Sequence, residues 1–121
     1  MSISEAESAV MQVLWSTHPL SAQEIVERVA APNDWTDVTV RSLLNRLLKK
    51  GALSAVRDGR KYLYSPVLSR EEYVDTESRG LLDRLFDGQL APLVSHFSER
   101  EALSPEDVRA LKALVEELPD G

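Results

Sequence analysis

The most regular hydrophobic pattern in the chain runs from Thr36 to Lys50 and is followed by Gly51. Its apolar residues recur at spacings of three and four, which puts them on one stripe of an α-helix. They are Val40, Leu43, Leu44, Leu47 and Leu48. Thr36 is a favourable N-cap, and Trp35 before it can pack on Val40 as a hydrophobic staple. The pattern predicts a helix docked on a core.

The opposite side of this predicted helix carries cations and neutral hydrogen-bonding groups without a carboxylate. It consists of Val38, Thr39, Arg41, Ser42, Asn45, Arg46 and Lys49. A basic helix face can simply be solvated, and that is the common outcome for an isolated helix. A short helix with one apolar side and one cationic side also suits insertion into the major groove of DNA. The surrounding sequence favours the second interpretation.

Two capped helices are predicted before this one. Ser4 and Glu7 form an S-x-x-E capping box, as do Ser21 and Glu24, and apolar residues follow each box at helical spacing. The first helix is expected to end near Thr17. Breaker residues at 31–34 (APND) predict the turn into the Thr36 helix. Capped helices joined by a short turn match a helix-turn-helix.

A β-hairpin is predicted after Gly51, because the apolar period changes there. The segments 53–57 (LSAVR) and 60–65 (RKYLYS) are strand-like, and Asp58-Gly59 between them favours a two-residue type I′ turn. Three helices followed by a hairpin is the order of a winged helix.

That turn predicts a repulsive charge pair at the hairpin tip. Arg57 would face Arg60, and Val56 would face Lys61. Like charges directly opposite each other destabilise a hairpin by roughly 0.2–1 kcal/mol. A phosphate between the two arginines would remove the repulsion, so this arrangement favours nucleic acid as a partner.

The remaining segment, 69–121, is predicted to form three helices. Ser69 opens the first through a further S-x-x-E box, and that helix ends near Gly88. A short apolar stretch spans 90–97. Ser104 followed by Pro105 begins the last helix. The expected fold is therefore mainly α with a small β-hairpin wing, comprising a winged-helix domain over 1–68 and a helical dimerisation region over 69–121.

About fifty residues rich in leucine, without a disulfide, cover their own apolar surface poorly. The simplest partner is a second copy in a two-fold dimer; the alternative is that the segment folds back on its own winged-helix domain. The predicted dimerisation residues are Leu81, Leu82, Leu85, Phe86, Leu90, Leu93, Val94, Phe97, Val108, Leu111, Leu114, Val115 and Leu118.

Charge is unevenly distributed along the 121 residues, whose net charge is −6. Residues 1–68 hold 8 Lys and Arg against 7 Asp and Glu, whereas residues 69–121 hold 6 against 13. Seven cations lie within 38–64, opposed only by Asp58. The sequence indicates a basic patch on a near-neutral domain, followed by an acidic segment.

Cysteine is absent, which excludes disulfides and thiolate metal sites. No apolar run approaches a membrane span and the N-terminus lacks a signal peptide, so a cytoplasmic protein is expected.

Several strings resemble the penicillinase-repressor family (BlaI/MecI/CopY) over essentially the whole chain. They are E-x-x-VM-x-VLW at 7–15, W-T-x-x-TV-R-S-LLNRLLKKGAL at 35–53, DGRKYLYSP at 58–66, LLDRLFDG at 81–88 and the closing LSPEDVRALKALVEEL. The resemblance implies a homodimeric winged-helix repressor that binds an inverted-repeat operator in promoter DNA. It also implies that the protein takes part in the regulation of antibiotic resistance. It implies no cofactor.

The resemblance also assigns residues. The family's recognition-helix positions fall on Thr39, Arg41, Ser42, Asn45 and Arg46, and its wing falls on 57–61. Many members carry Lys where this chain has Val38, for which we predict contact with a thymine methyl group. Some relatives are inactivated when a membrane-bound sensor metallopeptidase cuts an Asn-Phe bond, and the matching place here is His96-Phe97; a core role for Phe97 is the alternative.

The full predicted DNA-binding set is Thr36, Val38, Thr39, Arg41, Ser42, Asn45, Arg46, Lys49, Lys50, Arg57, Arg60 and Lys61. Val38, Arg41, Ser42 and Asn45 are expected to face base edges, and Thr39, Arg46, Lys49, Lys50 and the wing arginines to meet phosphates. Two other classes of regulator stay open: a repressor that senses a small molecule, and a winged helix used only for protein–protein contact. Enzyme activity is not expected, because the chain lacks a nucleophile–base spacing, a phosphate loop and a metal-ligand cluster.

Overall fold

The computed structural model describes residues 1–119 and divides into two compact units, Met1–Asp75 and a second that begins at Thr76. The division falls inside a helix that begins at Arg70, a few residues beyond the predicted domain boundary at 68.

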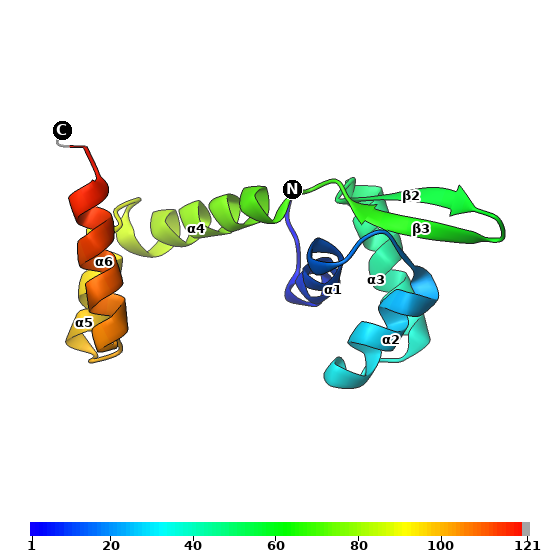
Figure 1. The fold of residues 1–121 in the computed structure, drawn as a ribbon, viewed down its shortest axis with the longest axis horizontal. Helices are drawn as coiled ribbons and strands as arrows, with labels where there is room; N and C mark the ends of the chain where they lie inside the picture. Colours follow the sequence, from blue (N-terminus) through cyan, green and yellow to red (C-terminus); the bar gives the residue numbers. More distant parts are fainter. Residues whose placement is uncertain (120–121) are drawn as a thin grey trace. The chain divides into compact units, whose positions relative to one another are not determined.

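The first unit contains three helices and a small sheet (Figure 1). In chain order its elements are α1 (Glu5–Ser16), β1 (Leu20–Ser21), α2 (Ala22–Asn33), α3 (Asp37–Lys50), β2 (Leu53–Asp58) and β3 (Lys61–Pro66). The predicted starts of the helices are confirmed, because Ser4, Ser21 and Thr36 are their N-caps. A side-chain oxygen at each cap accepts a backbone N–H that the first helical turn would otherwise leave unpaired.

One hydrophobic core joins the three helices of this unit. The predicted stripe of α3 is confirmed, since Val40, Leu43, Leu44 and Leu47 are buried. They pack with side chains from α1 and α2, among them Met11, Leu14 and Ile25. The end of α3 is set by Gly51, which has a φ of 79° and lets the chain turn into β2.

The sheet has three antiparallel strands in the order β1-β3-β2. Its shortest strand, β1, was not predicted, because two residues carry no period that a sequence pattern could reveal. In β1, Leu20 pairs with Tyr64 and Ser21 pairs with Leu63. The pairing holds the start of α2 beside the hairpin.

The predicted turn of the hairpin is wrong by one residue. Asp58 pairs with Lys61, so the two turn residues are Gly59 and Arg60 rather than Asp58 and Gly59. Gly59 has a φ of 64° whereas Arg60 is not among the residues of positive φ, which is the pattern of a type II′ turn.

This shift also corrects the predicted cross-strand pairs. Arg57 lies opposite Tyr62, and Val56 lies opposite Leu63. Arg57 and Arg60 do not pair across the strands, so the hairpin tip has no such repulsion for a phosphate to relieve. An Arg beside an aromatic ring across two strands is a compatible pair.

The predicted break at residues 31–34 begins later than expected. α2 continues through Pro32 to Asn33 and ends at Asp34, which has a φ of 56°. A proline this close to the end removes only one helical hydrogen bond. In addition, Asn33 donates its side-chain Nδ2 to the carbonyl of Val29 at 2.9 Å. The helix therefore tolerates Pro32 in its last turn.

The fourth helix, α4 (Arg70–Phe86), begins on the first unit. Its predicted Ser69 box is confirmed by reciprocal hydrogen bonds with Glu72. Trp15 of α1 donates its Nε1 proton to the carbonyl of Leu68 at 2.9 Å, and its ring lies 5.4 Å from that of Tyr73. These contacts fix the first turn of α4 to α1.

The second unit contains the rest of α4 together with α5 (Ala91–Glu99) and α6 (Pro105–Glu117). Ser104 caps α6 and Pro105 is its first residue, as predicted. Between Thr76 and Pro119 not one residue is buried. No helix within residues 1–119 combines the length and hydropathy that crossing a membrane requires.

Candidate nucleic-acid interface

The exposed side of α3 is the centre of the candidate interface. Thr36 begins the helix by accepting the backbone N–H of Thr39 at 3.2 Å, so its hydroxyl is engaged in capping. Burial of the leucine stripe turns the remaining predicted residues outward: Val38, Thr39, Arg41, Ser42, Asn45, Arg46 and Lys49 are all exposed. Val38 is an apolar side chain that is 77% exposed. Packing in the core therefore does not explain why an apolar residue is present at this position.

The exposed residues of α3 divide into a middle row and two edges. Successive helical residues are about 100° apart, so Val38, Ser42, Asn45 and Lys49 lie within about 60° of one another around the axis. Arg41 lies on one edge of this row. Thr39 and Arg46 lie on the other edge, with Arg46 about 140° from Arg41. The two arginines therefore face different surroundings.

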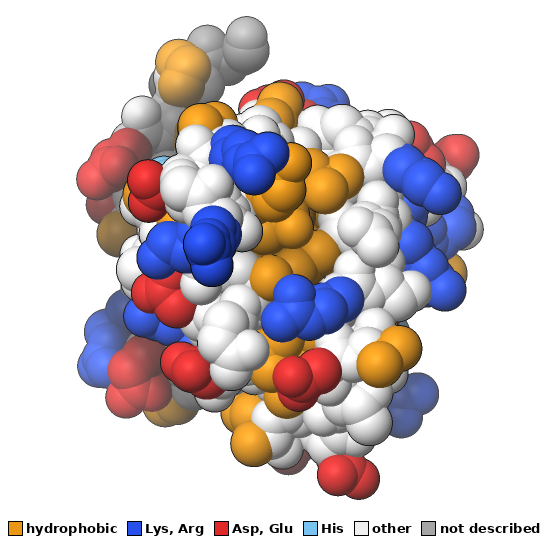
Figure 2. Space-filling model, turned by 90° about the vertical axis from the view of Figure 1, so that its right-hand side faces the viewer, with side chains coloured by type: hydrophobic (Ala, Val, Ile, Leu, Met, Phe, Trp, Pro, Cys, Tyr) orange, Lys and Arg blue, Asp and Glu red, His pale blue; other side chains and the backbone are white. Residues whose placement is uncertain are grey.

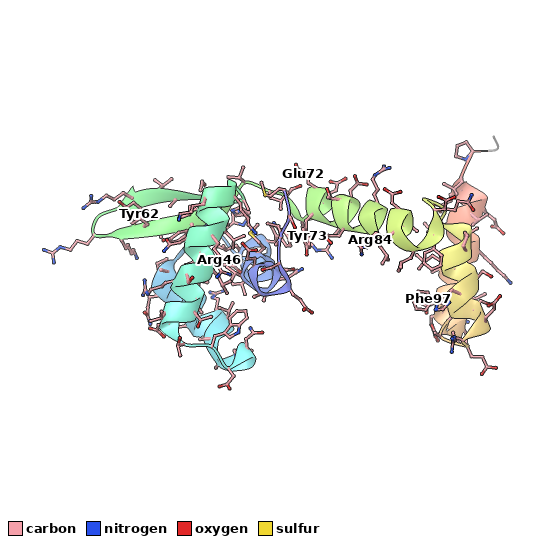
Figure 3. The ribbon with its side chains drawn as sticks, turned by 180° about the vertical axis from the view of Figure 1, so that it is seen from behind. Arg46, Tyr62, Glu72, Tyr73, Arg84 and Phe97 are labelled. Atoms are coloured by element: carbon pink, nitrogen blue, oxygen red, sulfur yellow. The ribbon has the colours of Figure 1, made fainter. Side chains whose placement is uncertain are left out.

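The hairpin supplies the second group of cations. Arg57, Arg60 and Lys61 are exposed, as the wing prediction requires. Arg57 donates its Nε proton to the carbonyl of Gly59 at 3.1 Å, which holds its side chain along the turn. Figure 3 shows Tyr62 on the hairpin and Arg46 on α3.

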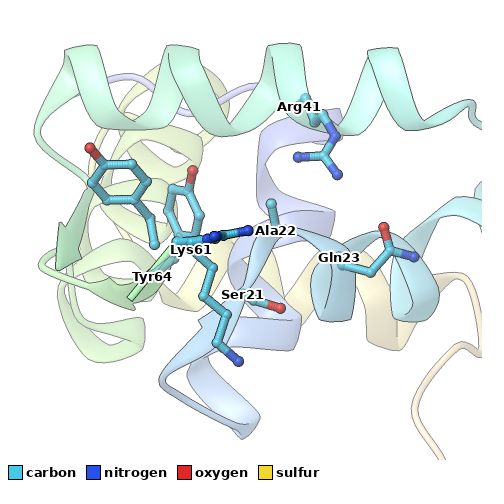
Figure 4. Close-up of a pocket in the computed structure, with 8 residues that line it drawn as sticks. Ser21, Ala22, Gln23, Arg41, Lys61 and Tyr64 are labelled. Atoms are coloured by element: carbon cyan, nitrogen blue, oxygen red, sulfur yellow. The ribbon is translucent and has the colours of Figure 1, made fainter. Parts of the chain in front are cut away.

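A pocket with a volume of about 290 Å³ lies where α3, the hairpin and the start of α2 meet; we call it the basic basin. Its lining residues are Ser21, Ala22, Gln23, Arg41, Arg60, Lys61, Tyr62 and Tyr64. Figure 4 shows the side chain of Arg41 extending from α3 toward the first residues of α2, while the side chain of Lys61 comes from β3 and runs past Ser21. The basin brings together three of the predicted cations.

Five lining residues of the basin were not predicted as part of the site. Ser21, Ala22 and Gln23 come from the start of α2, and Tyr62 and Tyr64 come from β3. The two groups of residues meet at the basin because β1, which leads into α2, pairs with β3. That contact joins segments about forty residues apart, and no local sequence signal marks it.

Lys50 differs from the other predicted DNA-binding cations. Its Nζ lies 2.6 Å from Oε1 of Glu7 and 2.8 Å from the carbonyl oxygen of Ser2. Glu7 is 1% exposed, and its Oε1 also accepts the backbone N–H of Ser4 at 2.9 Å. Burial raises the pKa of the Glu7 carboxyl, but the bonds from Lys50 and Ser4 outweigh it and hold that pKa below 4.5. Lys50 thus joins the end of α3 to the start of α1.

The face of the first unit that carries the hairpin has basic, hydrophobic and acidic side chains together. Figure 2 looks at the side from which the hairpin projects, where Lys and Arg side chains lie around hydrophobic ones and Asp and Glu side chains are also present. Asp37, in the first turn of α3, is one exposed carboxylate of this unit. It stands near the positive end of the helix dipole, where an anion is stabilising.

The predicted dimerisation residues are all at least partly exposed. Leu85, Leu90, Phe97, Val108, Leu114, Val115 and Leu118 are exposed, and the other six are half-buried. An apolar groove of about 360 Å³ lies between α5 and α6 and is lined by residues that include Leu93, Phe97 and Leu111. The predicted cleavage position, His96-Phe97, lies inside α5, and the rings of these two residues are 5.6 Å apart. Figure 3 shows where Phe97 lies.

Comparisons with known proteins agree on one family. The sequence model of a family described as "Penicillinase repressor" matches residues 3–117. The chain is 33% identical to the penicillinase repressor of Bacillus licheniformis over 115 residues, which are 95% of this chain and 90% of that protein. It is 29% identical to the methicillin resistance regulatory protein MecI of Mammaliicoccus sciuri over 113 residues, 93% of this chain and 92% of that protein.

Solved structures match the first unit. The DNA-binding domain of the repressor BlaI in solution aligns with a TM-score of 0.55 and 33% identity, covering 60% of this chain and 88% of that one. A monomeric form of Bacillus licheniformis BlaI in complex with the blaP half-operator aligns with a TM-score of 0.54 and 33% identity, covering 60% and 89%. The predicted winged-helix fold is confirmed by these neighbours.

Proposed function

The chain belongs to the penicillinase repressor family, and on that premise we propose that it represses transcription by binding double-stranded DNA as a homodimer. The observation that carries the proposal is the two-sided character of α3. One side is buried and wholly apolar, and the other exposes amide, hydroxyl and cationic groups. Within residues 1–119, neither Arg46 nor Lys49 has a hydrogen bond or ion pair with the protein. These groups are free to meet DNA.

We assign three residues of the middle row of α3, Val38, Ser42 and Asn45, to the base edges. Ser42 and Asn45 supply hydrogen-bonding groups, and Val38 supplies an apolar contact for a thymine methyl group. Thr39, Arg46, Lys49 and the wing cations Arg57, Arg60 and Lys61 meet phosphates, which fix register but carry no sequence information. Lys50 is left out of this set, because its ammonium group is held by Glu7.

The homodimer is proposed from the second unit. Its helices leave large apolar side chains exposed, including Leu85, Leu114 and Leu118. Exposed apolar surface of this extent is typical of an interface, and a two-fold copy is the simplest partner because the same surface serves on both subunits. A two-fold dimer presents two α3 helices, which suits an inverted-repeat operator.

Release from the operator is proposed to follow cleavage of the second unit by a membrane-bound sensor metallopeptidase. The matching bond, His96-Phe97, lies within α5. A protease needs an extended substrate, so α5 must open locally before cleavage. Because α5 contributes apolar side chains to the groove with α6, cutting it would weaken the dimer and so release the DNA.

DNA binding is tested with the full chain and a duplex selected from a random library by the protein itself. If each subunit meets three or four phosphates, the logarithm of the binding constant should fall with the logarithm of salt concentration at a slope of about −5 to −7. The double variant Arg41→Ala/Arg46→Ala should lose binding. Arg84→Ala/Arg100→Ala removes the same charge from the second unit and should retain it.

Two outcomes would contradict this function. If no duplex is selected at low ionic strength while the chain still associates with other proteins, the winged helix serves protein–protein contact instead. If sedimentation shows a monomer at the concentrations at which operator binding saturates, the homodimer is wrong even though the DNA-binding assignment stands.

A further inference from the structure

We propose that the basic basin holds one phosphate group of the DNA backbone, and that Arg41 anchors this phosphate instead of reading a base edge. The inference rests on the proposed DNA-binding function and deepens it. It also reverses the sequence-based expectation for Arg41, which grouped that residue with Ser42 and Asn45 as a base reader. Two features of the molecule support it: the charge of the basin and the position of Arg41.

The first observation is that three cations gather in one pocket whose described lining has no acidic side chain. Arg41, Arg60 and Lys61 come from three places in the chain and line one pocket. Within residues 1–119 none of the three forms a hydrogen bond or an ion pair with the protein, and the described lining contains no Asp or Glu. Like charges gathered in one pocket repel one another and attract an anion. A phosphodiester supplies that anion.

The two carboxylates near Lys61 do not fill this role. Asp58 lies opposite Lys61 across the strands but is not among the residues that line the basin. Glu24 accepts the backbone N–H of Ser21 at 3.0 Å, in the capping box that begins α2. This hydrogen bond is the main reason that the pKa of Glu24 is lowered, and Lys61 contributes less. Glu24 is therefore bound in the cap and is not among the residues that line the basin.

The second observation is the direction of Arg41. It lies on the edge of the exposed face of α3, about 60° from Val38 around the helix axis. Figure 4 shows its guanidinium directed toward the start of α2, on the side of Ala22 and Gln23. A side chain that reads bases should point away from the protein with the middle row, as Asn45 does by its position. Arg41 instead faces the side of the groove, where the backbone runs.

The basin also contains neutral groups that suit a phosphate. Tyr62 is half exposed, and its phenol can donate a hydrogen bond to a phosphate oxygen. The amide of Gln23 can do the same; its present contact with Glu27 is long, at 3.4 Å, and exposed. A DNA strand whose phosphate enters the basin would pass between α3 and the hairpin. α3 and the hairpin would then contact the same DNA strand from opposite sides.

The first test compares Arg41→Ala with Asn45→Ala in the full chain. Both positions are exposed on α3, so both variants should melt at the wild-type temperature. Arg41→Ala should bind the selected duplex about tenfold more weakly for each subunit, lower the salt slope by about 1 for each subunit, and select the same sequences as wild type. Asn45→Ala should select different sequences.

The second test locates the phosphate. Single phosphates of the selected duplex are replaced, one at a time, by neutral methylphosphonates. One replacement should weaken wild type and Arg46→Ala equally yet leave Arg41→Ala unaffected, because the contact it removes is already lost. Arg46→Ala serves as the matched control, since it removes the same side chain from the other edge of α3.

The results separate the two levels of the argument. If wild type selects no duplex, the proposed function fails and this inference fails with it. If wild type binds but Arg41→Ala selects new bases at one position of each half-site, Arg41 reads a base and the inference alone is overturned. The same holds if every methylphosphonate weakens Arg41→Ala and wild type by equal factors.

Discussion

The two units of this chain share a local signal that begins α1, α2 and α6, but they differ in what covers their apolar side chains. Ser4 and Ser21 in the first unit and Ser104 in the second all form reciprocal capping boxes. In the first unit the stripes of α1, α2 and α3 bury one another. In the second unit no residue from 76 to 119 is buried.

The contrast separates helix formation from helix burial. A cap and a helical spacing determine where a helix starts and which side is apolar. They do not determine what packs on that side. In the first unit the chain itself supplies the partner, whereas in the second a partner of the same sequence is proposed. The contrast can be tested by changing one leucine in each unit, and then two adjacent lysines of α3 that differ in their contacts.

The largest difference is expected between two leucines of the two units. Leu14 is 0% exposed and Leu114 is 58% exposed. Leu14→Ala should lower the free energy of unfolding of the first unit by about 4 kcal/mol, because it leaves a cavity in a packed core. Denaturant titration at two protein concentrations measures this, and the loss should not depend on concentration.

Leu114→Asp is the counterpart in the second unit. It should leave the stability of the first unit unchanged but raise the dissociation constant of the dimer at least about 100-fold, since two carboxylates would be buried at the interface. Sedimentation velocity measures the dimer. An unaltered dimer would mean that α6 lies outside the interface and that another surface of the second unit is the contact.

The next effect concerns two adjacent lysines of α3. Lys50→Met should destabilise the first unit by about 3 kcal/mol, the lower end for breaking a buried pair, because Lys50 is itself partly exposed. Lys49→Met should change stability by less than about 0.5 kcal/mol and instead weaken DNA binding. Equal losses of stability in the two variants would contradict the assignment of Lys50 to Glu7.

The same pair predicts a pH dependence. The folded pKa of Glu7 is lowered below 4.5, so its contribution to stability is fully present above about pH 5 and is lost as pH falls through that lowered value. The free energy of unfolding of wild type should decline in this range. Glu7→Gln should decline less steeply, and an identical slope would show that Glu7 is not responsible.

The smallest effect is expected at Val38. Its exposure excludes a core role, so Val38→Lys should keep stability within about 0.5 kcal/mol. The change should alter which operator is preferred, because a cation replaces an apolar contact in the middle row of α3. Selection from a random duplex library compares the two proteins. Identical selected sequences would remove Val38 from the base-reading set.

The helices were predictable because their signals are local. The boundaries of α1, α3 and α6 follow from caps within four residues of each start, and the buried stripe of α3 follows from its spacing. The position of the hairpin turn was not predictable, because Asp58-Gly59 and Gly59-Arg60 are both acceptable two-residue turns. Its register depends on how the strands enter the sheet, and Tyr64 pairs with Leu20 as well as with Ala55.

The candidate site was predictable only in part, for the same reason. The exposed residues of α3 follow from helical pitch. The partner of Lys50 lies 43 residues away at Glu7, and Gln23 reaches the basin only through β1. Contacts of this kind depend on how elements pack, and the sequence carries no periodic trace of them. Lys50 consequently resembled a phosphate contact until its surroundings were known.

The bond from Lys50 to the carbonyl of Ser2 has a practical consequence. Ser2 precedes Ile3, which is 7% exposed, so the first residues of the chain are part of the packed structure at the end of α3. An affinity tag fused ahead of Met1 would be attached beside the helix that is proposed to enter the groove. Operator affinities measured on such a fusion should be compared with those of a protein tagged elsewhere or with its tag removed.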